Sequence, residues 1–404
     1  MVFGPGNSST SAHLAKPSGD SALSLSSFDT SVDGNYTPSL PGTDGEGEFD
    51  KSTISDLVAK FGSASATAWL EFDRYKIWQS PEDIPPSTFL PVQGYMRRDP
   101  HIFAWGNPLV SDTSALEPTA KAFAKWVEEH DLQLIWSCVD EYLERVLGGP
   151  SFGWSTVSCI YEDVLDPSHV IDITSSDDGV EKAGGSGTSS HLKDLKKNLR
   201  RADKVCVEAF EVSTNSWTEG LRKEVEEGVE NWRRSKSGLQ LASASLQPWL
   251  DEEHRRYWIS QHEGKVVGLL ILTPIKGNTY QIKNAVSFPE APKGTSEALI
   301  HTALKDLHEE QEARGTTSDR IEERTVVTFG TTASDMLHPV ENLAGWKVSA
   351  LAKTYGKIAK GAGLLRRGDF RNKFDPAHEP MYVCYPEDGF GLEGVKALLK
   401  LLKK

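Results

Sequence analysis

YWISQHEGKVVGLLILTPIKGNTYQIKNAVSFPEAPKGTSEALIHTAL, residues 257–304, contains the pattern that decides the fold. Its first part is a series of short runs rich in Val, Ile and aromatic residues, which is typical of strands. Breaks at Gly264, Pro274 and Gly277–Asn278 predict turns between these strands. From residue 296 the apolar residues recur with the period of an amphipathic helix. We therefore expect a meander of strands that leads through a turn into a long helix.

The alternation of strands and helices continues on both sides of this stretch. Strands are predicted over 101–106, 132–138, 154–165, 205–212 and 324–332, and helices over 119–130, 139–148, 191–205, 221–236 and 296–314. Such a pattern is typical of an α/β or α+β architecture, and we expect two similar halves, 51–212 and 213–404. Residues 1–50 are rich in Ser, Gly and Pro and predict a disordered tail, and 174–190 predict a flexible loop.

Composition excludes several classes of protein. The formal charge of −14 argues against coating nucleic acid along the whole chain, although it allows one local basic strip. The longest apolar stretch, 266–272, is far shorter than the ~20 residues of a membrane helix, and no secretory signal is visible, so we expect a cytoplasmic protein. No zinc-site, P-loop, nucleophile-elbow or dinucleotide motif occurs. We expect no metal and four reduced, buried cysteines: Cys138, Cys159, Cys206 and Cys384.

A basic stripe interrupts this acidic chain between residues 191 and 205. Six basic side chains recur at i, i+3, i+4, i+7, i+8 and i+11, which places them on one face of a helix: Lys193, Lys196, Lys197, Arg200, Arg201 and Lys204. The apolar residues Leu192, Leu195, Leu199 and Cys206 fall mostly on another face. The stripe is either a solvated surface or a contact for a polyanion.

The turn PEAPKGT, residues 289–295, joins a predicted strand to the long helix. The amino terminus of a helix offers unpaired amides and the positive end of its dipole, which suit an anion or a developing oxyanion. Thr295 or Ser296 is the expected cap. The alternative is an ordinary strand-turn-helix joint.

Two segments near the carboxyl end mix charge with apolar residues. In LLRRGDFRNKFDPAHEPMYVCYP, residues 364–386, four basic residues surround Phe370 and Phe374: Arg366, Arg367, Arg371 and Lys373. This mixture fits a cleft for a phosphate or carboxylate, or else a loop held by salt bridges to Asp369 and Glu379. A strand is expected after Asp375–Pro376. The ending GVKALLKLLKK predicts a basic amphipathic helix that lies on a membrane surface or docks on the core.

These segments, taken in order, resemble the catalytic domain of the bacterial phosphatidylglycerol lysyltransferase family. GDFRNKFDPAHEPMYVCYP is similar to its closing motif, in which a Lys-Phe-x-Pro run leads to Glu-Pro and a Tyr-rich strand. HIFAWGNPLV resembles its early strand and turn, HLKDLKKNLRRA its Leu-Arg-bearing helix, FPEAPKGT its Pro-rich turn and VVTFGTTAS a later strand. The resemblance covers roughly residues 95–390.

The resemblance implies a tandem GNAT-like acyltransferase fold and an enzyme that moves an amino acid from aminoacyl-tRNA to a lipid hydroxyl. Aminoacyl-tRNA is then a co-substrate, and no other cofactor is expected. Bacterial members usually carry a membrane flippase domain. This chain looks more like the freestanding fungal members, the ergosteryl-glycine synthases, which transfer glycine from glycyl-tRNA to the 3β-hydroxyl of ergosterol. Such an enzyme would meet membrane sterol as a peripheral protein through its carboxy-terminal helix, and DNA is not an expected partner.

The resemblance also implies where the site lies. The candidate catalytic residues are Arg371, Lys373, Lys283 and Asp369. The candidate substrate-binding residues are Gly294, Thr295, Gly330, Phe370, Phe374, Glu379 and Tyr382, and the basic stripe is the candidate tRNA contact. One departure affects the carry-over of roles: Lys283 and Val286 stand where bacterial members have an Asp and an Arg.

Three other functions remain open at this point. The first is an acetyl-CoA-dependent GNAT acetyltransferase, for which PKGT is a poor version of the expected pyrophosphate loop. The second is a non-catalytic tRNA- or lipid-binding protein on the same fold. The third keeps aminoacyl transfer but changes the acceptor to a phospholipid or a peptide.

Overall fold

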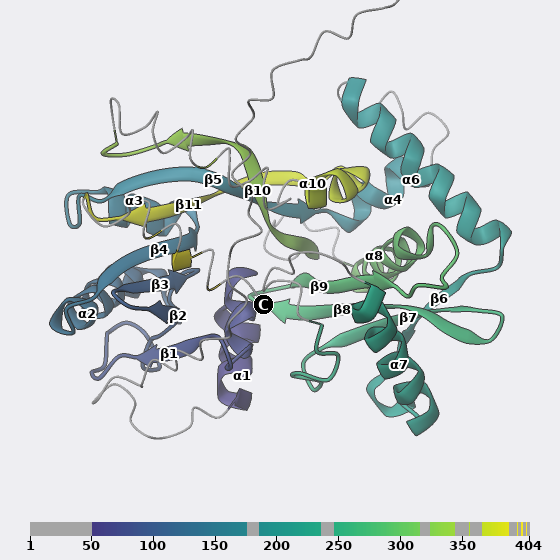
Figure 1. The fold of residues 1–404 in the computed structure, drawn as a ribbon, viewed down its shortest axis with the longest axis horizontal. Coiled ribbons are helices and arrows are strands. Elements are labelled where there is room, and N and C mark those ends of the chain that lie inside the picture. The colour runs from purple at the N-terminus through teal and green to yellow at the C-terminus, as the bar shows by residue number, and fades with distance from the viewer. Residues whose placement is uncertain are drawn as a thin grey trace, which may run out of the picture. The chain divides into compact units, whose positions relative to one another are not determined.

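The computed structural model describes residues 51–175, 186–235, 246–315, 324–343, 355, 366–387, 394, 397–398 and 401. The predicted tail 1–50 and most of the predicted loop 174–190 lie outside these residues. Eleven strands in the described part form one sheet in the order β1-β2-β3-β4-β11-β5-β10-β9-β8-β7-β6 (Figure 1). The strands are β1 (Lys76–Gln79), β2 (Val92–Arg98), β3 (His101–Trp105), β4 (Gln133–Val139), β5 (Ser155–Leu165), β6 (Glu208–Val212), β7 (Arg256–His262), β8 (Lys265–Ile275), β9 (Thr279–Ser287), β10 (Val326–Pro339) and β11 (Ala377–Tyr385).

Five of the α-helices that connect these strands lie where periodicity predicts them. The α-helices are α1 (Lys51–Phe61), α2 (Leu116–Glu129), α3 (Glu141–Gly148), α4 (Pro167–Ser175), α6 (Ser186–Lys204), α7 (Glu219–Ser235), α8 (Thr295–Ala313) and α10 (Arg366–Arg371). The short 3-10 helices are η2 (Ser65–Leu70), η3 (Thr113–Ala115), η4 (Thr214–Ser216) and η7 (Asn372–Phe374). The mixed α/β fold class is therefore confirmed, and the five predicted helices are α2, α3, α6, α7 and α8. The pattern did not indicate α1, α4, β1, β2, the four 3-10 helices or α10, which forms where the sequence predicted a cleft or loop without a helical face.

The meander predicted within residues 257–288 is present as β7, β8 and β9. Gly264 and Gly277, both with φ of +75°, turn the chain between these strands, as predicted. The break at Pro274 was wrong, because Pro274 lies inside β8 opposite Tyr280. β7 pairs with β8 only as far as Leu272, so beyond that point β8 has, among the described strands, a pairing partner on one side only. A residue without an N–H is tolerated there because fewer ladder hydrogen bonds are required.

The parallel strands β9 and β10 stay together for only a few residues. Thr279–Gln281 pair with Val326–Thr328, and no further β9–β10 pairs follow among the described residues. β10 then continues beside β5, with a register shift between Thr328 and Thr331. Gly330, at φ of +72°, lies in this irregular stretch. We call the place where the two strands part, marked by Gln281 and Gly330, the β9–β10 fork.

Helices cover both faces of the second half of the sheet. Leu270 of β8 packs with Leu195 of α6 and Leu299 of α8 in one buried cluster. Its neighbour Leu269 packs with Val225 of α7 in another. Because successive residues of a strand point to opposite faces, α6 and α8 lie on one face and α7 on the other (Figure 1). The GNAT-like core that the resemblance implied is formed by the β7–β9 meander, the helix α8 and the strand β10, which is parallel to β9.

The amino-terminal elements pack against the first half of the sheet. Ile54 of α1 and Trp69 of η2 share a buried cluster with Phe103 of β3. Leu398 and Leu401, at the chain's carboxyl end, pack against the same cluster. These apolar residues of the predicted basic helix therefore dock on the core, while its lysines lie outside the described residues.

One sheet runs through both predicted halves. β6, which ends the predicted first half, lies at the far edge beside β7, and β11, from the predicted second half, lies between β4 and β5. Each half thus contributes one strand to the other's side of the sheet. The division near residue 212 stays a prediction.

Candidate functional site

The fork has two chemically different sides, and β5 supplies an acidic residue to each. Glu162 and Asp163 are consecutive in β5, so their side chains point to opposite faces of the sheet. Asp163 faces α10 and η7, where Arg371 contacts it. Glu162 hydrogen-bonds with Thr328 of β10 on the other face, the one on which η2 lies.

On the α10 side, Arg371 and Asp163 form a buried ion pair. Arg371 Nη1 lies 2.9 Å from Asp163 Oδ2, and their side chains are 14% and 1% exposed. The same nitrogen donates to the carbonyl oxygens of Gly330 and Thr331, each at 3.1 Å, and to the Thr332 hydroxyl. His378 Nδ1 lies 2.8 Å from the other Asp163 oxygen. Arg371 therefore ties α10 to the irregular stretch of β10.

A second ion pair on this side joins three elements. Lys373 Nζ of η7 lies 2.7 Å from Glu297 Oε1 of α8, and the Asn198 amide of α6 donates to the same oxygen at 2.8 Å. The Lys373 ammonium also lies 5.0 Å from the centroid of the Phe370 ring. Glu297 is buried, so this pair holds η7 and α6 against the amino-terminal turn of α8.

On the η2 side, Lys283 of β9 is buried beside Glu71. Its Nζ lies 3.7 Å from Glu71 Oε1, with side chains 10% and 8% exposed, and donates to the Thr67 carbonyl at 3.3 Å. Burial lowers the pKa of the Lys283 ammonium to about 8, although Glu71 opposes the shift. The Thr67 hydroxyl donates to Gln281 Oε1 at the fork.

Glu162 adds a second perturbed group on the η2 side. Burial raises the pKa of its carboxyl above the usual range, Glu379 and Asp163 add to the shift, and the Thr328 hydroxyl opposes it. An amine with a lowered pKa and a carboxyl with a raised pKa on one face are typical of sites that move protons near neutral pH.

The turn before α8 is built differently from the sequence prediction. The cap is Gly294, at φ of +99°, and neither Thr295 nor Ser296 caps the helix. Thr295 is buried, and its hydroxyl donates to the Pro292 carbonyl at 2.8 Å. A Cβ at Gly294 would lie 2.2 Å from the Asn198 carbonyl oxygen, so a glycine is needed for α6 to approach this turn.

The remaining predicted residues are spread over several places. Phe374 is fully buried between Phe329 and Phe370, with ring centroids 5.7 Å and 6.0 Å apart. Asp369 is exposed on α10. Glu379 is exposed on β11 opposite Glu162, and Tyr382 is buried in a separate cluster with Trp136. The side chains of Arg366 and Arg367 lie outside the described residues. The structure brings Arg371 together with Gly330 and places Lys283 on the opposite face.

The basic stripe lies on the solvent side of α6. Leu192, Leu195 and Ala202 are buried against the core, which orients the helix. Five of the six basic residues are exposed and Lys196 is half-buried; the exposed ones are Lys193, Lys197, Arg200, Arg201 and Lys204. Cys206, expected on the apolar face, is exposed beyond the helix end, whereas the other three cysteines are buried. The stripe is accessible to a polyanion.

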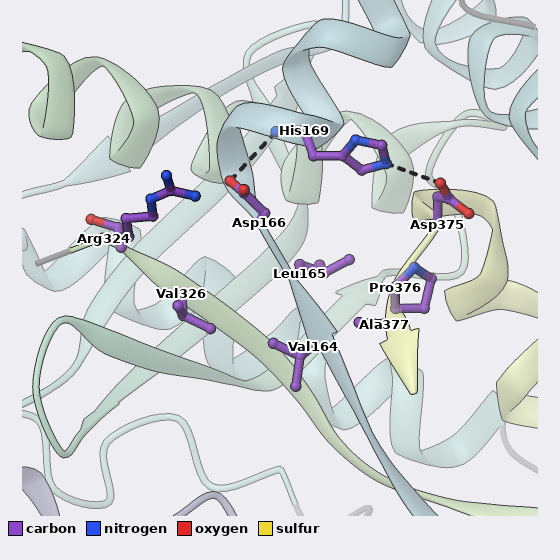
Figure 2. Close-up of a pocket in the computed structure, with 10 residues that line it drawn as sticks. Val164, Leu165, Asp166, His169, Arg324, Val326, Asp375, Pro376 and Ala377 are labelled. Carbon is purple, nitrogen blue, oxygen red and sulfur yellow. Dashed lines mark hydrogen bonds and ion pairs between the residues drawn. The ribbon is translucent and has the colours of Figure 1, made fainter. Parts of the chain in front are cut away.

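An open pocket of about 430 Å³ lies where β5 ends and β10 and β11 begin. Val164, Val326 and Ala377 form its apolar part (Figure 2). On its rim His169 Nε2 lies 2.9 Å from Asp375 Oδ2. None of the predicted site residues lines this pocket.

A group of possible metal ligands lies elsewhere in the described part of the chain. Asp251, Glu253 and His254 bring ligand atoms within 4.8 Å of one another. Both ring nitrogens of His254 already have partners, Asp251 at 2.6 Å and Asp56 at 2.8 Å. We assign this group no metal.

Comparison with known proteins decides the family. The family model described as phosphatidylglycerol lysyltransferase, C-terminal, matches residues 94–385. The chain belongs to the phosphatidylglycerol lysyltransferase C-terminal family. As a member of this family, it is an acyltransferase of the aminoacyl-tRNA-dependent class, as the resemblance implied. The acetyl-CoA alternative gains no support from this membership.

Solved structures of two proteins share the phosphatidylglycerol lysyltransferase fold of this chain. The C-terminal domain of a putative lysylphosphatidylglycerol synthetase from Agrobacterium fabrum is 14% identical, with a TM-score of 0.62 and coverage of 87% of this chain and 96% of that one. L-PGS from Bacillus licheniformis is 13% identical, with a TM-score of 0.62 and coverage of 87% and 95%. No curated protein sequence matches the chain. In the described residues no helix is long and apolar enough to cross a bilayer.

Within this phosphatidylglycerol lysyltransferase fold, three groups at or beside the fork were not predicted from the sequence: Glu71, Glu162 and Gln281. Two consecutive acids inside the apolar strand WSTVSCIYEDVL were a usable signal for Glu162 and Asp163. Glu71 gave no such signal, because it precedes the stretch that matches the family. Its place beside Lys283 depends on the packing of η2.

Proposed function

We propose that this protein esterifies a lipid hydroxyl with a neutral amino acid from aminoacyl-tRNA, and that glycine and ergosterol are the specific pair. The observation that carries the proposal is the buried Lys283 ammonium beside the fork. The family supplies the reaction class. The sterol acceptor rests on the resemblance to freestanding members, and phosphatidylglycerol, the acceptor in the family's name, is the second candidate.

The positive charge of Lys283 supports the transfer of an amino acid whose side chain is uncharged. The resemblance places an Asp of the bacterial family members at this position, and an Asp can pair with a cationic amino acid. This chain has the Lys283 ammonium there, on the η2 side of the fork. Like charges in a buried, low-dielectric setting repel strongly, so a lysyl or arginyl side chain is disfavoured there. Glycine meets no such cost, because it has no side chain.

The exposed stripe on α6 supports tRNA as the carrier. Lys197 and Arg200 are exposed, and the buried residues of α6 fix the direction in which the basic face points. The chain as a whole is acidic, with a formal charge of −14, so a polyanion gains most by binding at this strip.

The transfer exchanges one ester for another, so positioning and proton movement are the main demands on the protein. The acceptor oxygen forms a bond to the aminoacyl carbonyl carbon, the bond from that carbon to the ribose oxygen breaks, and the acceptor's proton ends on the ribose hydroxyl. We propose that the carboxylate of Glu162 accepts this proton and passes it to the ribose oxygen, while Lys283 stays an ammonium. The raised pKa of the Glu162 carboxyl supports this role, because it lets the group hold the proton between the two transfers.

We also propose that the reaction takes place at a cytoplasmic membrane surface, where a sterol or phospholipid is available. Leu398 and Leu401 dock on the core, so the basic residues of the carboxy-terminal segment would provide the attraction to the membrane.

The test is transfer from a pool of labelled aminoacyl-tRNAs into vesicles that contain ergosterol, phosphatidylglycerol or neither. Label from glycine in an alkali-labile sterol ester is the expected result. Label in phosphatidylglycerol would select the second acceptor, and the absence of labelled lipid from every donor would contradict the proposal. The variant Lys283→Asp should lose glycine transfer, whereas Lys305→Asp, an exposed lysine on α8, should not.

A further inference from the structure

We propose that residues 65–71, which precede the family-matched stretch, are a specificity-determining element of the transfer site, because they hold Lys283 at the fork and so discriminate against donors with a cationic side chain. The proposal rests on the function proposed above. Thr67 and Glu71 are positioning residues in it, since they act through Lys283 and Gln281.

Three contacts join this element to β9. The Thr67 hydroxyl donates to Gln281, the Thr67 carbonyl accepts from Lys283 at 3.3 Å, and the Glu71 carboxylate lies 3.7 Å from the Lys283 ammonium. Gln281 in turn lies against Gly330 across the fork, since a Cβ added at Gly330 would be 2.5 Å from the Gln281 Nε2. One short helix therefore sets the side chains of both Gln281 and Lys283.

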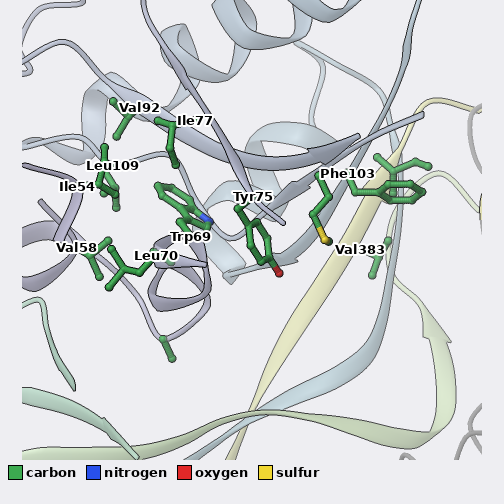
Figure 3. Close-up of a cluster of buried hydrophobic side chains, with 14 of the residues drawn as sticks. Ile54, Val58, Trp69, Leu70, Tyr75, Ile77, Val92, Phe103, Leu109 and Val383 are labelled. Atoms are coloured by element: carbon green, nitrogen blue, oxygen red, sulfur yellow. The ribbon is translucent and has the colours of Figure 1, made fainter. Parts of the chain in front are cut away.

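The element is anchored by the strands of the first half. Trp69 is fully buried, and its indole donates to the Trp105 carbonyl at 2.8 Å. Gly94 of β2 leaves the space that this ring fills, since a Cβ there would lie 2.3 Å from it. Figure 3 shows Trp69 and Tyr75 among the buried side chains of this cluster. An anchored segment presents Glu71 and Thr67 to Lys283 in one arrangement.

The charges around Glu71 do not cancel. Its second oxygen lies 3.5 Å from Arg74 Nη1, so one carboxylate serves two cations. Arg255, which is 5% exposed, adds a further positive charge that lowers the pKa of Lys283 along with burial, whereas Glu71 opposes the lowering. Without the carboxylate of Glu71, Lys283 would be neutral over more of the physiological pH range. Glu71 thus maintains the charge that excludes a cationic donor.

The first experiment measures Lys283 directly and needs neither donor nor acceptor. The chain is labelled with [ε-¹³C]lysine, the Lys283 signal is assigned by its loss in Lys283→Met, and its titration is followed by NMR. Glu71→Gln should move the Lys283 midpoint to lower pH, whereas Glu82→Gln, an exposed glutamate, should leave it unchanged. An unmoved midpoint in Glu71→Gln would overturn the proposal, whatever the enzyme's substrates are.

The second experiment compares glycyl-tRNA with lysyl-tRNA at pH 8. If the midpoint falls by about one pH unit, the protonated fraction of Lys283 falls from about one half to about one tenth. The neutral fraction, which does not repel a cationic side chain, then rises from about one half to about nine tenths. The ratio of lysyl to glycyl transfer should therefore rise by up to about twofold in Glu71→Gln and stay constant in Glu82→Gln.

An equal loss of transfer activity with both donors would mean that residues 65–71 only support the fold, and would contradict their role in specificity. Thr67→Val, which removes the hydroxyl that reaches Gln281, is a second variant in case Glu71→Gln folds poorly. If the wild-type protein transfers no amino acid at all, the proposed function fails, while the NMR titration still decides whether Glu71 holds the charge of Lys283.

Discussion

Arg371 Nη1 lies 2.9 Å from Asp163 Oδ2 in a pair whose carboxylate is almost wholly buried. The same nitrogen also reaches two carbonyl oxygens of β10, so Nη1 is occupied by the protein itself. Arg371 was a candidate catalytic residue, and its contacts give it a structural role.

We therefore expect Arg371→Ala to destabilise the fold. Removal of one partner leaves the Asp163 carboxylate buried without its cation, which typically costs about 3–5 kcal/mol. Urea denaturation followed by tryptophan fluorescence measures the loss. Arg234→Ala, at an exposed ion pair on α7, is the matched control and should change the free energy of unfolding by less than about 0.5 kcal/mol. Equal stability of Arg371→Ala and wild type would rule out the structural role.

Lys283 should make stability depend on pH in a definite direction. Its pKa is about 8 in the folded chain and ~10.4 when unfolded, so unfolding takes up a proton between these values. The free energy of unfolding should therefore rise with pH across this window. Lys283→Met removes a burial penalty on the order of 3 kcal/mol at pH 7, and this gain should vanish above pH ~10.5.

Denaturation curves from pH 7 to 11 measure this dependence. Lys305→Met, an exposed lysine paired with Glu309, is the control and should show no gain that depends on pH. A constant difference between Lys283→Met and wild type across the range would contradict the lowered pKa of Lys283.

Charge reversal on α6 should weaken tRNA binding. The double variant Lys197→Glu/Arg200→Glu leaves Arg201 in place, because Arg201 donates to Asn198 at 3.1 Å. Loss of two phosphate contacts should lower the slope of log K against log salt by roughly 1.5. Filter binding at several salt concentrations gives the slope. Lys223→Glu/Arg234→Glu on α7 makes the same change of charge at exposed positions and should leave the slope as it is in wild type.

Gly294→Ala should separate α6 from the turn before α8. The added Cβ would lie 2.2 Å from the Asn198 carbonyl oxygen, and φ is +99°. Gly315→Ala is the matched control, since its φ is +67° but nothing lies within 4 Å. Both variants carry backbone strain, roughly 1 kcal/mol or more, so the additional loss in melting temperature of Gly294→Ala measures the close approach alone. Similar melting temperatures for the two variants would show that the approach is not tight.

Local patterns were sufficient for most elements of the fold. The 3.6-residue period of α6 and α8 and the apolar runs of β8 and β9 depend on neighbours in sequence, so they could be read directly. The position of Pro274 within β8 could not be read in this way, because it depends on which edge of the strand pairs with a neighbouring strand. The same holds for β11, which was expected as a strand but whose place between β4 and β5 is a matter of long-range pairing.

The candidate site divides in the same way. Lys283, Arg371 and Gly330 could be named as candidates because they lie in motifs of contiguous sequence that resemble the family. Their division between two faces of the sheet was not predictable, since strand irregularities at Gly330 and in β5 set which side chains share a face. Glu71 was missed because its contact with Lys283 spans a long sequence separation.

By itself the sequence determined the reaction class, the family and the identity of most helices and strands, because these follow from residue types at short, regular spacings. Only the tertiary structure decided which charges are buried together. It pairs Arg371 with Asp163 and Lys283 with Glu71, and it leaves the basic face of α6 in solvent. The physical reason is that the charge state and accessibility of a group depend on the burial and neighbours that folding creates.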